Sequence, residues 1–193
     1  MPRISAPTVA EHRAAKYRAL LDAARALLAE EPGTAPSLAA VAGRAGLARS
    51  SAYEYFKSRQ DLLDALIQDV FPRWSNRVTD AMTAAGTPDA QVLAYVDTNL
   101  ELVAEGEHAV ARALAAIAPG QQIDDSNRAM HQQLSHPLLD ALREMNLPDP
   151  ATTAELINAI VYSASSLIEA GGDPAHVRSR ASELLTPFLR ETR

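Results

Sequence analysis

Apolar residues recur at helical spacing along almost the whole chain, and short breaks of proline, glycine and capping residues separate the runs. In the first run Leu20, Ala24 and Leu27 share one helix face, and Pro32-Gly33 ends it. Only 8 glycines occur in 193 residues, which favours helix formation throughout. The pattern predicts an all-α protein of about nine helices, with no strand or repeat.

The breaks give approximate bounds for each expected helix. A proline at residue 72 is expected to kink or split the fourth helix, and Pro137 is expected to interrupt the seventh. Residues 1–60 are predicted to form a three-helix domain, and residues 61–193 a second helical domain. The expected helices cover about residues 8–30, 37–45, 47–55, 59–85, 88–105, 107–117, 124–145, 151–170 and 174 onward.

Composition excludes several classes of function. The chain has no cysteine, so disulfides, thiol catalysis and cysteine-ligated zinc are impossible. No apolar run reaches the roughly 18 residues that a membrane span requires, and the N-terminal residues lack the apolar core of a signal peptide. A soluble cytoplasmic protein is therefore expected.

The net charge of −6 conceals an uneven distribution. Residues 1–60 carry nine Lys/Arg against five Asp/Glu, whereas the remaining 133 residues carry 9 against 19. A basic N-terminal part can meet phosphates while an acidic body stays away from them. Random unevenness of surface charge would explain a surplus of this size equally well.

Residues 37–56 have the pattern of a helix-turn-helix. Ser37 is placed to cap a short helix, and Gly46 allows the tight turn that follows because glycine tolerates positive φ. The next helix is too short to be stable alone, so Leu47, Ala52 and Phe56 are expected to hold it against its neighbours. A short helix supported in this way can enter the DNA major groove.

Two groups of side chains on this motif suit DNA. Arg49, Ser50 and Ser51 lie at the start of the second helix, where arginine can read guanine and serines can reach bases or phosphates. Tyrosines and cations that follow offer donors to phosphate oxygens, which position the helix without reading sequence. Tyr53 could instead serve mainly as packing. The expected DNA-binding residues are Ser37, Arg49, Ser50, Ser51, Tyr53, Tyr55, Lys57 and Arg59.

At residues 16–66 the chain resembles the TetR family of bacterial transcription regulators. The shared features are a small-residue turn, a short helix ending in aromatic residues, a cation and a leucine pair. Two departures concern Ala48, where serine or threonine is common, and Arg59, which replaces the usual lysine. The matching residues are Leu20-Leu21-Asp22-Ala23-Ala24, Ala45-Gly46-Leu47, Tyr53-Glu54-Tyr55-Phe56, Arg59 and Leu62-Leu63.

The resemblance implies a non-enzymatic repressor that binds a palindromic operator as a homodimer. It also implies that a small molecule in the C-terminal domain releases the DNA, although in a TetR-like activator the ligand would promote binding. Two apolar helices near the C-terminus are the natural dimer interface, unless both lie wholly inside one protomer. The expected interface residues are Leu156, Ile160, Ala164, Leu167, Leu184 and Phe188.

The inducer site is the least defined by sequence. Asn99 would stand within an apolar helix face, and a buried amide must find a partner, which could be a ligand, a side chain or water. His131 and His136 lie five residues apart on different helix faces, so no metal site is expected, nor a cofactor. The candidate ligand residues are Trp74, Tyr95, Asn99, Met130, His131 and Tyr162.

Two other classes of protein share part of these features. A helical enzyme, carrier or small-molecule-binding protein could use the same C-terminal domain, but no catalytic constellation, phosphate loop or nucleophile motif is present. A protein-interaction module could use the basic N-terminal helices to bind an acidic partner. Operator binding distinguishes a regulator from both.

Overall fold

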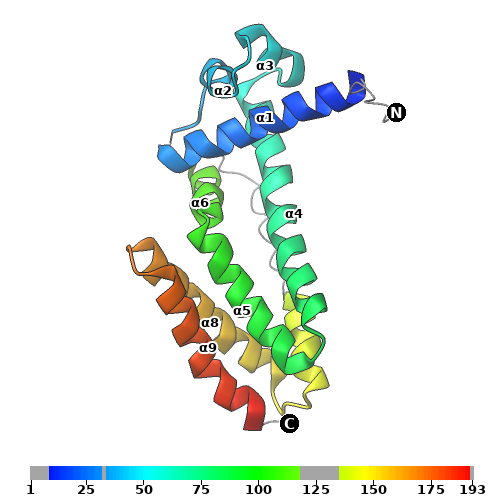
Figure 1. Cartoon of the computed structure of the whole chain (residues 1–193), viewed down its shortest axis with the longest axis vertical. Helices are drawn as coiled ribbons and strands as arrows, with labels where there is room; N and C mark the ends of the chain where they lie inside the picture. Colours follow the sequence, from blue (N-terminus) through cyan, green and yellow to red (C-terminus); the bar gives the residue numbers. More distant parts are fainter. Residues whose placement is uncertain (1–8, 32–33, 118–134, 192–193) are drawn as a thin grey trace, which may run out of the picture. The chain divides into compact units, whose positions relative to one another are not determined.

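The structure is a computed structural model, and it describes residues 9–31, 34–117 and 135–191. Every regular element within these ranges is a helix, as predicted. Residues 135–144 form a further helical segment that adjoins the undescribed stretch. The other helices are α1 (Val9–Glu30), α2 (Leu38–Arg44), α3 (Arg49–Tyr55), α4 (Arg59–Ala85), α5 (Pro88–Ala104), α6 (Glu107–Ile117), α8 (Pro150–Glu169) and α9 (Pro174–Glu191) (Figure 1).

The described residues form two compact units. The first lies within Met1–Asp69 and Val110–Pro119, and the second within Val70–Ala109 and Gly120–Arg193. Helix α4 begins in the first unit and ends in the second. The predicted domain boundary after residue 60 remains a prediction.

The first unit is built on α1, α2 and α3, with α1 packed on α2 and α2 packed on α3 (Figure 1). Its buried side chains come from the predicted apolar faces, including Leu20, Ala24 and Leu28 of α1 and Val41 of α2, none of which exceeds 1% exposure. Burial of each leucine stabilises the unit by about 2 kcal/mol. This packing supplies the stability that helices of seven residues lack in isolation.

The core of the second unit joins α5 to α8 and α9, which pack against one another (Figure 1). Leu100, Leu138 and Leu142 are fully buried in it. The core also draws on α4 through Val78 and Met82. Helix α5 carries eight buried residues, so it is the central helix of this unit.

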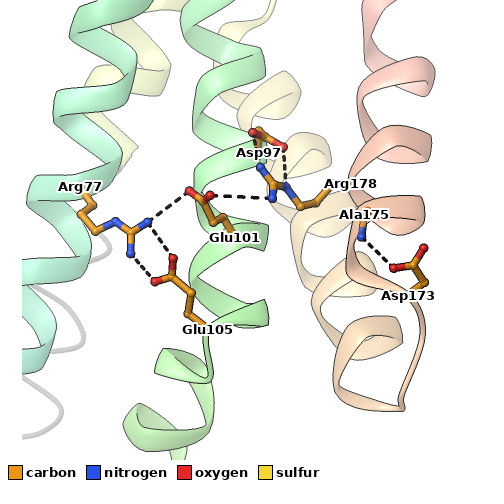
Figure 2. A network of polar contacts seen from close by, with 7 residues as sticks. All are labelled: Arg77, Asp97, Glu101, Glu105, Asp173, Ala175 and Arg178. Atoms are coloured by element: carbon orange, nitrogen blue, oxygen red, sulfur yellow. Dashed lines mark hydrogen bonds and ion pairs between the residues drawn. The ribbon is translucent and has the colours of Figure 1, made fainter. Parts of the chain in front are cut away.

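Ion pairs brace three helices of the second unit (Figure 2). Arg77 of α4 contacts Glu101 of α5 and Glu105 at its C-cap, with 3.2 Å to Glu101 and 3.1 Å to one Glu105 oxygen. Arg178 of α9 donates two hydrogen bonds of 2.8 and 2.7 Å to Asp97 of α5, and it lies 3.9 Å from Glu101. The network therefore ties both α4 and α9 to α5.

Most of the predicted helix ends agree with the structure, and some differ for clear reasons. Helix α3 begins at Arg49 rather than residue 47, because Ala48 takes the extended N-cap conformation. Helix α4 continues through Pro72 and is not split. The described part of the seventh helix also runs through Pro137, while its expected first part, from residue 124, lies outside the described residues.

Candidate nucleic-acid interface

The turn between α2 and α3 has the predicted geometry. The side chain of Ser37 accepts a hydrogen bond of 3.1 Å from the Ala40 amide and caps α2. Gly46 has φ +68°, and its amide and that of Leu47 bond back to α2 carbonyls. A residue with a side chain would be strained at this φ, so glycine fixes the change of direction. Ser37 thus has a structural role in addition to its predicted contact with DNA.

Helix α3 is held by its inner face and exposed on the other. Ala52 is fully buried, Phe56 is 2% exposed, and Leu47 is half-buried. Tyr17 of α1 packs against Phe56 with 5.5 Å between ring centroids. No side chain caps α3, because Ala48 stands at the N-cap position, as the departure from the family pattern predicts.

The predicted reading residues lie together at the start of α3. Arg49 and Ser50 are exposed, and Ser51 is half-buried. The guanidinium of Arg49 lies 5.7 Å from the ring centroid of Tyr53, which is 48% exposed, and donates a 3.4 Å hydrogen bond to its hydroxyl. That hydrogen bond raises the pKa of Arg49 above its ordinary value. Arg49 therefore presents a fixed charge with unused N–H donors on the exposed side of α3.

The predicted anchoring residues continue past the end of α3. Lys57 and Arg59 are exposed, and no carboxylate among the described residues pairs with either. Ser58 accepts a 3.1 Å hydrogen bond from the Asp61 amide and caps α4. The carboxylate of Asp61 accepts a 2.9 Å hydrogen bond from the Lys57 amide, which fixes the backbone between the two cations.

Two other arginines of the same unit are paired with carboxylates. Arg44 contacts Glu30 through both terminal nitrogens, and Arg18 contacts Asp69 at 2.6 Å. These hydrogen bonds raise the pKa of each arginine. Arg44 is thus engaged by a carboxylate, whereas Arg49, Lys57 and Arg59, which pair with no carboxylate among the described residues, lie on or beside α3.

A pocket of about 370 Å³ between α1 and α3 was missed by sequence reasoning. It is lined by Val9, His12, Arg13 and Lys16 of α1 and by Glu54 and Tyr55 of α3. The signal was present, because residues 9, 12, 13 and 16 have the spacing of one helix face. Tyr55, a predicted anchor, therefore shares its surroundings with cations of α1.

Three of the candidate ligand residues meet in the core of the second unit. The indole N–H of Trp74 donates a 2.9 Å hydrogen bond to the side-chain oxygen of Asn99, whose amide donates 2.7 Å to the Tyr95 carbonyl. The hydroxyl of Tyr95 donates 2.6 Å to Asn158, and burial raises the pKa of Tyr95 to about 12. The buried amide at residue 99 is thus satisfied by a side chain and a carbonyl.

Of the other three candidates the structure describes only Tyr162, which does not join this cluster. Tyr162 is 73% exposed on α8, whereas Trp74, Tyr95 and Asn99 are all buried. Met130 and His131 lie outside the described residues.

Exposed apolar side chains of α8 and α9 form a further surface feature. It consists of Leu156, Tyr162 and Leu167 of α8 with Leu184 and Phe188 of α9, which are between 40% and 73% exposed. Ile160 is half-buried and Ala164 is 6% exposed, and both line a groove of about 270 Å³ between the two helices. We call these residues the α8–α9 face.

Sequence comparison identifies relatives of the N-terminal part. Residues 20–66 match the model of the bacterial regulatory proteins of the tetR family. The HTH-type transcriptional regulator BetI of Rhizobium meliloti is 28% identical over 145 residues, which span 74% of this chain and 70% of that protein. The HTH-type transcriptional repressor LfrR of Mycolicibacterium smegmatis is 36% identical over 85 residues, or 44% of each chain.

Solved structures share the fold along most of the chain. LfrR from Mycobacterium smegmatis in complex with proflavine has a TM-score of 0.65 and 24% identity, covering 92% of this chain and 96% of that one. The transcriptional regulator FadR from Bacillus subtilis in complex with stearoyl-CoA has a TM-score of 0.67 and 19% identity, covering 88% and 97%. At these identities the likeness shows the fold alone.

No helix in the described ranges is long and apolar enough to cross a membrane. The family model falls on the helix-turn-helix and on the helices that flank it, where the cap, the turn and the exposed Arg49 have the geometry of a DNA reader. Regulators of this family bind DNA and are not enzymes. The chain belongs to the TetR family of bacterial transcriptional regulators.

Proposed function

We propose that this regulator is a repressor that binds a palindromic operator as a homodimer and leaves it when a small molecule occupies the C-terminal unit. The observation that carries the proposal is α3, a helix buried on one side with Arg49 and Ser50 exposed on the other. In this arrangement Arg49 reads a guanine from the major groove, and Tyr53, Tyr55, Lys57 and Arg59 contact phosphates.

The α8–α9 face supports the homodimer. A helix-turn-helix reads a palindrome with two copies of the reading helix, separated by about 34 to 36 Å. Large apolar side chains that are 56–66% exposed, such as Leu156, Leu167 and Leu184, favour burial against a partner. A second copy of the same face covers them in an isologous contact.

The buried cluster of Trp74, Tyr95 and Asn99 supports a ligand in the second unit. Its polar groups stand in an apolar core and are bonded to one another and to Asn158, so a ligand there makes mainly apolar contacts. LfrR with proflavine and FadR with stearoyl-CoA are structural neighbours whose ligands each include a large apolar part. We therefore infer a partly apolar inducer.

Selection of bound sequences from random duplex DNA tests the proposal directly. We expect a palindrome with half-sites about one helical turn apart. Arg49→Ala should weaken operator binding by about 1–3 kcal/mol and relax the preference at one base pair of each half-site. Arg59→Ala should weaken binding to all sequences alike and flatten its salt dependence.

Arg143→Ala is the matched control, because Arg143 is exposed in the second unit and pairs with Asp140 at 2.9 Å. Binding by this variant should equal that of the parent. A chain that selects no sequence would contradict the proposed operator. Unchanged binding by both the Arg49 and Arg59 variants would show that α3 is not the reader.

A further inference from the structure

We propose that the pocket between α1 and α3 is a second DNA contact, a phosphate socket that holds a backbone phosphodiester beside the reading helix. It is formed by His12, Arg13, Lys16, Glu54 and Tyr55, with Val9 at its edge. The inference rests on the proposed function and extends it to α1, a helix outside the helix-turn-helix.

The cations of α1 divide into two groups. Arg18 is engaged by Asp69, whereas Arg13 and Lys16 pair with no carboxylate among the described residues. Both face the pocket together with His12. A concave site with two fixed positive charges attracts an anion.

The aromatic residues orient the guanidinium of Arg13. It lies 5.6 Å from the ring centroid of Tyr55, and the ring centroid of Tyr17 lies 6.2 Å from that of Tyr55. A guanidinium stacked on a ring keeps its in-plane N–H donors available, which matches the oxygens of a phosphate. Phosphate is therefore the ligand class that the donors fit.

The position of the pocket selects a DNA phosphate over a free one. Tyr55 is the last residue of α3 and Arg49 is the first. Seven residues of helix place these ends about 9 Å apart, which is less than the roughly 12 Å width of the major groove. When Arg49 reads a base edge, the socket meets the backbone that borders the same groove.

Substitution of Glu54 tests the proposal through an expected gain in DNA affinity. Its carboxylate lines the pocket and repels a phosphate, while Arg13 and Lys16 attract it. Removal of the negative charge should therefore strengthen DNA binding, which loss of a merely structural residue would not do.

The experiment measures affinity of the full chain for its selected operator and for random duplex over a range of salt concentrations. Arg13→Gln and Lys16→Gln should each reduce the slope of log K against log salt by about 1, because one fewer counterion is released, and should leave sequence preference unchanged. Glu54→Gln should bind both DNAs a few-fold more tightly. Arg143→Gln, outside the pocket, should match the parent.

The outcomes separate this inference from the proposed function. If the parent binds duplex DNA and the three pocket variants match its affinity and its slope of log K against log salt, the pocket does not contact DNA. The proposed function of α3 is then unaffected. If the parent binds no duplex at all, the proposed function fails first. If the variants alter binding to polyglutamate but not to DNA, the pocket serves an acidic protein segment and the proposal is overturned.

Discussion

Two exposed regions of this chain, the surface around α3 and the α8–α9 face, differ in what they leave uncovered. Around α3 the exposed residues include Arg49, Lys57 and Arg59, cations without a carboxylate partner among the described residues. On the α8–α9 face large apolar side chains such as Leu156, Leu167 and Leu184 are exposed, while Arg178 of α9 is held by Asp97. Unpaired charge suits a reversible, salt-sensitive contact with phosphates, whereas exposed leucine suits a lasting contact with another apolar surface.

The largest expected effect follows from a charge placed in the apolar α8–α9 face. Leu184→Asp places a charge in the α8–α9 face of both copies of a dimer. An unpaired buried charge costs several kcal/mol, so the dimer dissociation constant should rise by more than about 100-fold. Sedimentation equilibrium measures this, and operator affinity should fall with it.

Ala84→Asp provides the matched control, because Ala84 is exposed on α4 and the same charge there should leave the dimer intact. A Leu184→Asp chain that remains dimeric would show that the face has another use.

A second prediction concerns the buried polar cluster of the second unit. Asn99→Ala removes the acceptor of the Trp74 indole and leaves that donor buried without a partner. The free energy of unfolding should fall by about 2–3 kcal/mol. Trp74 is the only tryptophan, so its fluorescence during urea denaturation reports this unit directly. Ser163→Ala, on an exposed part of α8, should change stability by less than about 0.5 kcal/mol.

A third prediction uses the buried phenol of Tyr95. Its folded-state pKa is about 12, above the ordinary value of 10.0, because burial disfavours the phenolate. The stabilisation is therefore complete below about pH 10 and is lost as the pH rises through 12, by about 3 kcal/mol in all. Denaturation of the parent and of Tyr95→Phe across this range measures the difference. Parallel pH profiles would contradict the prediction.

The smallest effect sharpens the contrast between paired and unpaired cations. Arg178→Ala removes the bidentate pair with Asp97, whose members are 29% and 45% exposed. Solvent screens such a pair, so the free energy of unfolding should fall by about 0.5–1 kcal/mol, and by less in high salt. A double-mutant cycle with Asp97→Asn isolates the coupling. DNA affinity at fixed salt should change little, in contrast to Arg59→Ala.

Helix ends were predictable wherever a short-range signal controls them. The cap at Ser37 and the turn at Gly46 were both identified from neighbouring residues, and the structure confirms them. Asp149 was missed as the cap of α8, although its carboxylate accepts from the Thr152 amide at 3.1 Å. Pro148 and Pro150, on either side of it, suggested a turn instead of the start of a helix.

Residues that act across helices were harder to predict. The Trp74–Asn99 hydrogen bond joins residues 25 apart, and the Tyr95–Asn158 bond joins residues 63 apart. The sequence indicated three of these four side chains, Trp74, Tyr95 and Asn99, as candidate ligand residues but could not show that they bond within the core instead. The pocket between α1 and α3 was missed for the same reason, since its cations lie about 40 residues from Tyr55 in sequence.

The sequence by itself determined the all-α class, most helix ends, the helix-turn-helix and its family, because periodicity, caps and turns act over a few residues. Tertiary structure alone decided which polar groups are engaged: Arg44 with Glu30, Asn99 with Trp74, Arg178 with Asp97. It also decided that Arg13 and Lys16 gather beside Tyr55. Such pairings depend on how packed helices bring distant residues together, which no local pattern records.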